Sequence, residues 1–217
     1  MTSDLFDSVP DTGPAREHMA EGAVLLRGHA RPLENELIAA LHDIVAQAPF
    51  RRMVTPGGHQ MSVAMTNCGP LGWTTDSSGY RYVQNDPETG KPWPAMPPAF
   101  AQLAERAAAA AGFNEFAPDA CLINCYEPGA RMSLHQDRDE QDFDKPIVSV
   151  SLGLPAIFLF GGLKRSDKTR RFRLAHGDVV VWGGPSRLFF HGVAPLADGE
   201  HVLLGRQRIN LTFRRAR

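Results

Sequence analysis

The chain has 217 residues, with 23 Lys and Arg against 24 Asp and Glu, so its formal net charge is −1. A hydrophobic content of 43% and a charged content of 22% exclude an intrinsically disordered chain and suit one large domain, or one domain with an extension. The near-zero charge argues against a protein that coats nucleic acid through bulk charge, although a local basic face remains compatible with it.

The N-terminus and the cysteines indicate the compartment. Residues 1–18 are polar and predict a loose leader, and their first ten lack the basic start and apolar run of a signal peptide. No stretch approaches the ~20 apolar residues of a membrane span. The three cysteines, Cys68, Cys121 and Cys125, do not form the dense pattern of a disulfide scaffold. We therefore expect a cytoplasmic protein with reduced thiols and no membrane contact.

Two helices are predicted in the N-terminal half. Arg31-Pro32 begins the first and Pro49 ends it, and Pro97-Pro98 begins the second, with Gly112 as its stop. The first carries an apolar stripe at helical spacing, formed by Leu33, Leu37, Leu41 and Ile44. Between the helices, residues 51–96 are rich in Gly and Pro, which favours short strands and turns.

From residue 119 onward, short apolar stretches alternate with turn residues. The predicted strands are 121–126, 147–154, 157–160, 172–174, 178–182, 188–193 and 208–214. Many short strands with few helices are typical of a mainly β barrel or jelly roll.

A His-x-Asp pair is the sharpest local motif. In an extended strand His135 and Asp137 point to the same side, and His191 is a lone polar residue in an apolar stretch. Two histidines and one carboxylate form the facial triad of non-heme Fe(II) oxygenases. His176 is a rival third ligand, and His191 as an ordinary core histidine is the plainer interpretation.

Residues 208–214 alternate strictly. Arg208, Asn210, Thr212 and Arg214 share one face, opposite Ile209, Leu211 and Phe213. Buried arginines are costly unless anions pair with them, and a dicarboxylate such as 2-oxoglutarate supplies two carboxylates. The alternative is a last strand whose polar face is solvated. Asn124 and Tyr126 share one strand face upstream and could hydrogen-bond the same cosubstrate.

Taken together, these residues resemble the AlkB-type alpha-ketoglutarate-dependent DNA alkylation-repair dioxygenases. The resemblance runs from about residue 22 to 214. It lies in residues 53–58, 61–69, 71–75, 91–96, 118–124, 134–137, 147–158, 176–184 and 210–214.

The resemblance implies a double-stranded β-helix (jelly roll, cupin-like) with flanking helices. It makes residues 117–217 the dioxygenase core and residues 1–116 an N-terminal extension that carries a nucleotide-recognition lid at about 51–96. It makes His135, Asp137 and His191 the Fe(II) ligands. Its 2-oxoglutarate contacts are Asn124, Tyr126, Arg208, Asn210 and Arg214.

The resemblance also implies the reaction and its substrate. Fe(II), 2-oxoglutarate and O2 would oxidise N-alkyl groups of bases such as 1-methyladenine and 3-methylcytosine, releasing formaldehyde, succinate and CO2. Single-stranded DNA is the expected partner of a monomeric enzyme, with RNA and duplex DNA as further candidates. The expected nucleotide contacts are Trp73, Tyr80, Tyr82, Asp139 and Arg165.

The charge is unevenly distributed along the chain. Residues 1–160 hold 11 basic and 20 acidic residues, and residues 161–217 hold 12 and 4. Six of the basic residues lie in 163–173, which could bind phosphate or form a solvated hairpin. Two other functions remain open, namely a 2-oxoglutarate-dependent hydroxylase of a small molecule or protein, and a non-catalytic jelly-roll binding module.

Overall fold

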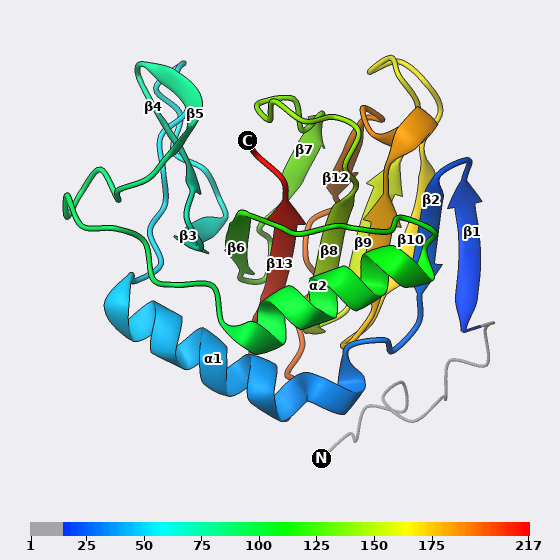
Figure 1. The fold of residues 1–217 in the computed structure, drawn as a ribbon, viewed down its shortest axis with the longest axis horizontal. Coiled ribbons are helices and arrows are strands. Elements are labelled where there is room, and N and C mark those ends of the chain that lie inside the picture. Colours follow the sequence, from blue (N-terminus) through cyan, green and yellow to red (C-terminus); the bar gives the residue numbers. More distant parts are fainter. Residues whose placement is uncertain (1–14) are drawn as a thin grey trace.

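The computed structural model describes residues 15–217 as two antiparallel sheets, a separate hairpin and two α-helices (Figure 1). The larger sheet has seven strands in the order β1-β2-β11-β8-β13-β6-β3. They are β1 (Arg16–Ala20), β2 (Ala23–Leu26), β11 (Val179–Trp182), β8 (Ile147–Gly153), β13 (Arg208–Arg214), β6 (Ala120–Tyr126) and β3 (Ala64–Cys68).

The smaller sheet has four strands in the order β10-β9-β12-β7. They are β10 (Arg170–Leu174), β9 (Ala156–Phe160), β12 (His191–Val193) and β7 (Met132–His135). Apolar residues of both sheets form one buried cluster, which includes Leu25, Val180 and Trp182 from the larger sheet and Phe158 and Phe172 from the smaller. Two sheets packed across a common core form the jelly-roll sandwich that the sequence predicted.

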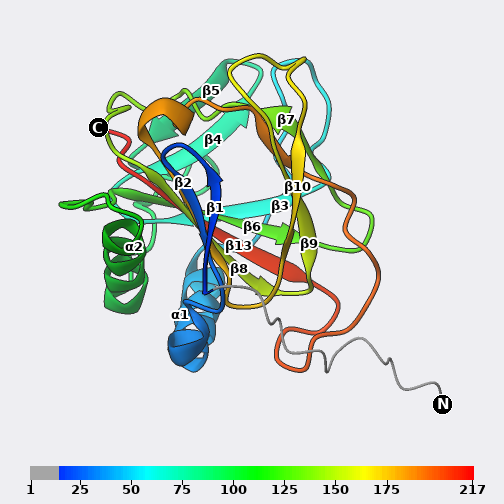
Figure 2. The same cartoon turned by 90° about the vertical axis from the view of Figure 1, so that its right-hand side faces the viewer.

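The two helices cover the outer face of the larger sheet (Figure 2). A short 3-10 turn, η1 (Arg31–Leu33), leads into α1 (Glu34–Gln47), and α2 (Pro98–Ala110) lies beside it. Leu37, Phe100 and Leu103 pack there against Leu211 and Phe213 of β13. The apolar side of β13 therefore faces the helices, and its polar side faces the interior of the sandwich.

A two-stranded hairpin belongs to neither sheet. It consists of β4 (Gly72–Asp76) and β5 (Gly79–Val83), and it projects from the same end of the sandwich as β7 and β12 (Figure 1). Its strand β4 contacts β3 and β6 of the larger sheet. Gly72 is required where the hairpin packs on Trp93, because a Cβ on Gly72 would lie 2.3 Å from the indole nitrogen.

Some predicted boundaries were wrong. A loose leader was predicted for residues 1–18. Residues 1–14 lie outside the described part of the chain, but Arg16–Ala20 forms β1. β2 was missed because a four-residue apolar run does not reveal its conformation by periodicity. The strand predicted at 188–193 begins only at His191.

The N-terminal part of the chain shares the larger sheet with the C-terminal part. β2 pairs with β11, and β3 pairs with β6. The division of the chain into residues 1–116 and 117–217 stays a prediction. Neither α-helix within residues 15–217 is long and apolar enough to cross a membrane.

We expect α2 to stabilise the protein mainly through the side chains that it packs against the larger sheet. Leu103→Ala removes a side chain that is 1% exposed, so we expect the free energy of unfolding to fall by about 2–5 kcal/mol in urea denaturation. Glu105→Ala, on the exposed side of the same helix, is the control and should change it by less than ~0.5 kcal/mol. Equal effects of the two substitutions would contradict this packing.

Candidate functional site

A cavity of about 1010 Å³ opens between the β4–β5 hairpin and the end of the sandwich. Its walls contain seven of the residues that the sequence singled out, namely Trp73, Tyr80, His135, Asp137, Asp139, Arg165 and Arg214. These residues come from segments far apart in the chain, so the fold gathers them at one site.

Two histidines and one carboxylate meet beside this cavity, and two of them, His135 and Asp137, line it. His135 ends β7, His191 begins β12, and the two are direct cross-strand partners. Asp137 follows β7 by two residues, and the nearest ligand atoms of the three side chains all lie within 4.8 Å of one another. Asp137 Oδ1 is 3.6 Å from His135 Nε2, and Asp137 Oδ2 is 3.8 Å from His191 Nε2. This donor set matches the facial triad that holds Fe(II).

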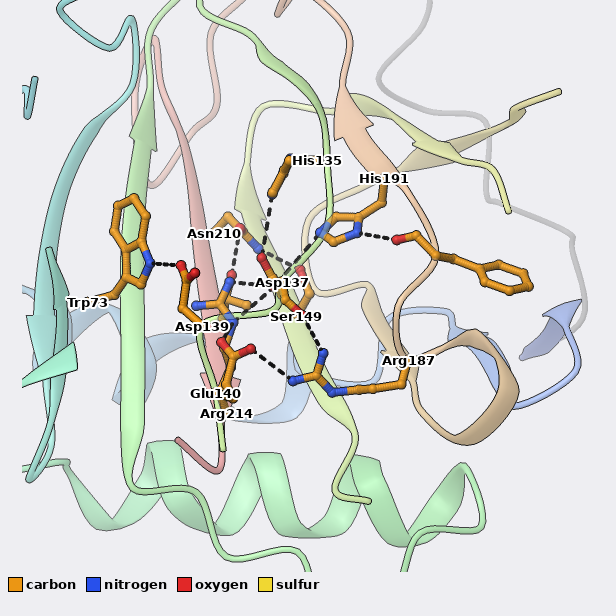
Figure 3. A network of polar contacts seen from close by, with 12 residues as sticks. Trp73, His135, Asp137, Asp139, Glu140, Ser149, Arg187, His191, Asn210 and Arg214 are labelled. Atoms are coloured by element: carbon orange, nitrogen blue, oxygen red, sulfur yellow. Dashed lines mark hydrogen bonds and ion pairs between the residues drawn. The ribbon is translucent and has the colours of Figure 1, made fainter. Parts of the chain in front are cut away.

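Both imidazoles are oriented for ligation (Figure 3). The Nδ1–H of His135 donates to the carbonyl of Ser133 at 2.8 Å, and that of His191 donates to the carbonyl of Phe189 at 3.0 Å. Each Nε2 is therefore left with a lone pair. Burial, and next the nearby His135, lower the pKa of His191 to about 4, so this imidazole is neutral at neutral pH.

The rival ligand His176 lies elsewhere. Its Nδ1 accepts the Gly153 N–H at 2.9 Å, and its Nε2 is 2.9 Å from Glu34 Oε2. His176 therefore ties α1 to the turn after β8. Within residues 15–217, the three-residue group with metal-ligand spacing is His135, Asp137 and His191.

Asp137 is paired from its other side with Arg214. Its Oδ2 accepts from Arg214 Nη2 at 2.6 Å and from Nε at 3.0 Å. Burial by itself would raise the pKa of Asp137, but Arg214, His191 and His135 outweigh burial and hold this pKa well below its usual range. The carboxylate is therefore fully ionised, as a metal ligand must be.

The polar face of β13 is buried, so the solvated-strand alternative is wrong. Arg208, Asn210, Thr212 and Arg214 are each at most 6% exposed. The register places Arg208 opposite Tyr126. It also places Asn210 opposite Asn124, so β6 and β13 bring the predicted cosubstrate residues together.

Arg208 carries a buried charge that its protein neighbours satisfy only in part. Its Nη2 donates to Ser151 Oγ at 2.9 Å, and its guanidinium carbon lies 5.0 Å from the centre of the Tyr126 ring. Among the described residues, Nε and Nη1 of Arg208 and Oδ1 of Asn124 are buried without a hydrogen-bond partner. Buried polar atoms normally have partners, so the two orphaned donors of Arg208 fit an anionic ligand such as a carboxylate.

An aromatic pair borders the outer part of the cavity. Trp73 on β4 and Tyr80 on β5 are stacked, with ring centroids 5.6 Å apart and an interplanar angle of 19°. The Trp73 indole N–H donates to Asp139 Oδ2 at 2.8 Å (Figure 3), and Tyr80 is 49% exposed. Arg165 lies over the Phe190 ring at the cavity wall, 5.1 Å from its centroid.

Tyr82 is the exception among the predicted nucleotide contacts. It does not line this cavity, because its side chain is 8% exposed and packs with Leu71, Ala120 and Ala216. Its hydroxyl donates to Glu140 Oε1 at 2.5 Å. Burial raises the pKa of Tyr82 well above its ordinary value, so the hydroxyl stays protonated and remains a donor.

Sequence reasoning missed two charged residues behind the metal-binding cluster. Glu140 and Arg187 form an ion pair at 3.1 Å, with side chains only 2% and 3% exposed. Glu140 lies in an acidic run and Arg187 follows a Gly-Gly-Pro turn, so both sequence contexts resemble solvated surface. No local sequence pattern distinguishes these two buried residues from exposed ones.

Comparison with known proteins agrees with this geometry. The model of the 2OG-Fe(II) oxygenase superfamily matches residues 22–214. The chain belongs to this superfamily. The enzyme class and the cofactors predicted from the sequence, Fe(II) and 2-oxoglutarate, are those of the superfamily.

Individual relatives narrow the family further. The chain is 60% identical over 212 residues to the alpha-ketoglutarate-dependent dioxygenase AlkB of Escherichia coli, with 98% of each chain covered. It is 52% identical over 185 residues to an AlkB homolog of Caulobacter vibrioides, covering 85% of this chain and 82% of that one. The solved structure of OsALKBH1 superposes with a TM-score of 0.81 at 28% identity, covering 92% of this chain and 99% of the other. The resemblance to AlkB-type dioxygenases is confirmed.

Loss of one triad residue should abolish iron binding. His135→Ala removes one ligand from a half-exposed position, so the fold should persist while the site loses an imidazole. We expect the variant to retain no stoichiometric Fe(II) in anaerobic equilibrium dialysis. His42→Ala, on the exposed side of α1, should bind Fe(II) like the wild type. Unchanged Fe(II) binding by His135→Ala would exclude His135 as a ligand.

Proposed function

We propose that this protein removes N-alkyl groups from nucleic-acid bases by oxidation, using Fe(II), 2-oxoglutarate and O2. The observation that carries the proposal is a His-Asp-His cluster whose His135 and Asp137 line the same cavity as the Trp73–Tyr80 stack. The E. coli and C. vibrioides relatives are named as alpha-ketoglutarate-dependent dioxygenases, and the mouse relative ALKBH1, 37% identical over 134 residues, is named as a nucleic acid dioxygenase.

The chain's own residues bind and orient the reactants. His135, Asp137 and His191 hold Fe(II). Arg208 and Arg214, with Asn124, Tyr126 and Asn210, hold 2-oxoglutarate. Bound Fe(II) and 2-oxoglutarate supply the O2-dependent oxidation of the N-alkyl carbon, with succinate and CO2 as by-products. The hydroxymethyl group then leaves as formaldehyde, so the protein needs no nucleophile of its own.

Arg208 and Arg214 have different tasks toward the cosubstrate. Arg214 is already paired with Asp137, so it would receive the cosubstrate carboxylate nearest the metal while it continues to orient Asp137. Arg208 has two unpaired donors and would bind the distal carboxylate. The two guanidinium groups thereby fix the direction in which 2-oxoglutarate lies.

The outer cavity suits a single base. A base stacked in a duplex cannot reach a buried metal, so the target is single-stranded or is flipped out at a cost of a few kcal/mol. Stacking on an aromatic side chain is worth ~1–3 kcal/mol per base, and Trp73 and Tyr80 offer such surfaces. Methylation at N1 of adenine or N3 of cytosine makes the base cationic, and Asp139 supplies a carboxylate at the same wall.

The hairpin that joins β9 to β10 provides a basic surface for the strand. Its exposed cations are Lys164, Arg165, Lys168, Arg170, Arg171 and Arg173. Contacts from such side chains to phosphate position a nucleic acid without reading its sequence. We therefore propose single-stranded DNA as the preferred partner, with RNA and duplex DNA as further substrates, and a monomeric enzyme in the cytoplasm.

A methylated oligonucleotide tests the proposed function directly. The protein, incubated with Fe(II), 2-oxoglutarate, O2 and single-stranded DNA that carries 1-methyladenine, should remove the mass of the methyl group, as measured by mass spectrometry. His135→Ala protein is the control and should leave the oligonucleotide unchanged. Turnover of 2-oxoglutarate by the wild type without loss of the methyl group would instead favour a hydroxylase of a small molecule or protein.

Arg208→Met should separate cosubstrate binding from metal binding. The substitution removes the charge that we assign to the distal carboxylate but keeps an unbranched side chain of similar length. A hydrogen bond to a charged group contributes about 1.5–3 kcal/mol, so we expect the Kd for 2-oxoglutarate to rise about 10- to 100-fold in anaerobic titrations. Fe(II) affinity should stay within about twofold of the wild type, and a loss of iron binding alone would contradict the assignment.

A further inference from the structure

The buried ion pair between Glu140 and Arg187 has no task in binding the metal or the cosubstrate. Its side chains are almost fully enclosed, and the Nη2–Oε2 distance is 3.1 Å. A buried ion pair is weak evidence for stability, because apolar residues of similar volume often stabilise a protein at least as well. The partners of these two side chains suggest a different role.

Arg187 holds the backbone of the metal-binding segment (Figure 3). It follows the short turn η2 (Gly184–Ser186), and its Nη1 donates to the carbonyl of Asp137 at 2.8 Å. Its Nε donates to the carbonyl of Lys145 at 3.1 Å. Arg187 thus fixes both the main chain at Asp137 and the carboxylate of Glu140.

Glu140 joins the hairpin to the arginine that orients Asp137. Its Oε1 accepts from Tyr82 on β5 at 2.5 Å and lies 3.3 Å from Arg214 Nε. The same Arg214 is bonded to Asp137 Oδ2. One carboxylate oxygen therefore contacts both the hairpin and the Asp137–Arg214 pair.

The hairpin is attached to this segment at a second point. Trp73 on β4 donates to Asp139, which lies between Asp137 and Glu140 in the chain. As strands, β4 and β5 pair only with each other, and the Asn67 side chain of β3 hydrogen-bonds the Trp73 backbone. Residues 137–140 are thus held by contacts on two sides, with the metal-binding cluster through Asp137 and with the hairpin through Asp139 and Glu140.

We propose that Glu140 is a positioning residue that couples the β4–β5 hairpin to the Asp137–Arg214 pair, so that loading the site with Fe(II) and 2-oxoglutarate orders the hairpin. Binding fixes Asp137 and Arg214, these fix Glu140, and the Tyr82 hydroxyl transmits the restraint to β5. Because coupling between two sites is reciprocal, a base held by the hairpin would in turn tighten cosubstrate binding. That last consequence rests on the proposed function, whereas the ordering of the hairpin does not.

Hydrogen exchange measures the coupling without any nucleic acid. Under anaerobic conditions, addition of Fe(II) and 2-oxoglutarate to the wild type should slow amide exchange in residues 72–83 by at least ~5-fold, the lower end of typical coupling between sites. Tyr82→Phe removes only the hydroxyl and leaves Glu140 paired with Arg187 and Arg214. In this variant the change should be below ~2-fold, while the Kd for 2-oxoglutarate stays within about twofold of the wild type.

Asp76→Asn is the matched control. It breaks the 2.6 Å Asp76–Arg81 ion pair of the same hairpin, and neither residue contacts Glu140. Asn keeps the Oδ1 acceptor for the Ser78 N–H, so the turn should persist. This variant should respond like the wild type.

The proposal is overturned if the wild-type hairpin does not respond to Fe(II) and 2-oxoglutarate, if Tyr82→Phe keeps the full response, or if Asp76→Asn loses it equally. These outcomes are distinct from a failure of the proposed function, which is seen in the oligonucleotide assay. If Fe(II) and 2-oxoglutarate slow amide exchange in the hairpin but the protein leaves methylated DNA unchanged, the coupling proposal stands and only the proposed substrate is wrong.

Discussion

Two guanidinium groups on the buried face of β13 impose the constraint on which the site depends. Arg208 and Arg214 are 1% and 5% exposed, so each needs a negative partner inside the sandwich. Arg214 finds Asp137 and Glu140, whereas Arg208 has a serine hydroxyl and an aromatic ring. One arginine is therefore neutralised by the protein, and the other attracts an anionic ligand.

Because of this difference, β13 can both orient Asp137 through Arg214 and offer Arg208 to an anionic ligand. The Asp137–Arg214 pair keeps the carboxylate ionised and oriented before any metal arrives, and the two histidines keep Nε2 free through bonds to nearby carbonyls. The orphaned donors of Arg208, on the same buried face of β13, make a second position favourable for a carboxylate. The larger sheet thus supplies both arginines through β13, and the smaller sheet supplies the two histidines through β7 and β12.

The substrate side is built differently. The aromatic stack lies on a hairpin outside both sheets, and its connections to the metal-binding segment run through Asp139 and Glu140. A hairpin that pairs with neither sheet has fewer backbone hydrogen bonds to restrain it than a central strand of the sandwich, so its order can change more readily. The near-zero net charge fits this arrangement, because the cluster of six basic residues in 163–173 is balanced by the acidic excess of residues 1–160.

Local patterns predicted the fold class, and they indicated the triad and the cosubstrate strand while leaving alternatives open for both. The alternation of residues 208–214 places both arginines on one face of the strand, and the structure shows that this face is buried. Resemblance supplied the predicted nucleotide contacts, and among them Tyr82 is buried and does not line the cavity. The Tyr82–Glu140 and Arg187–Asp137 contacts join residues 58 and 50 positions apart, between segments that look like turns and solvated surface. Only the tertiary structure shows these contacts, because it buries Glu140 and Arg187 beside partners that are distant in the sequence. Their local sequence, an acidic run and a turn, is typical of solvated residues.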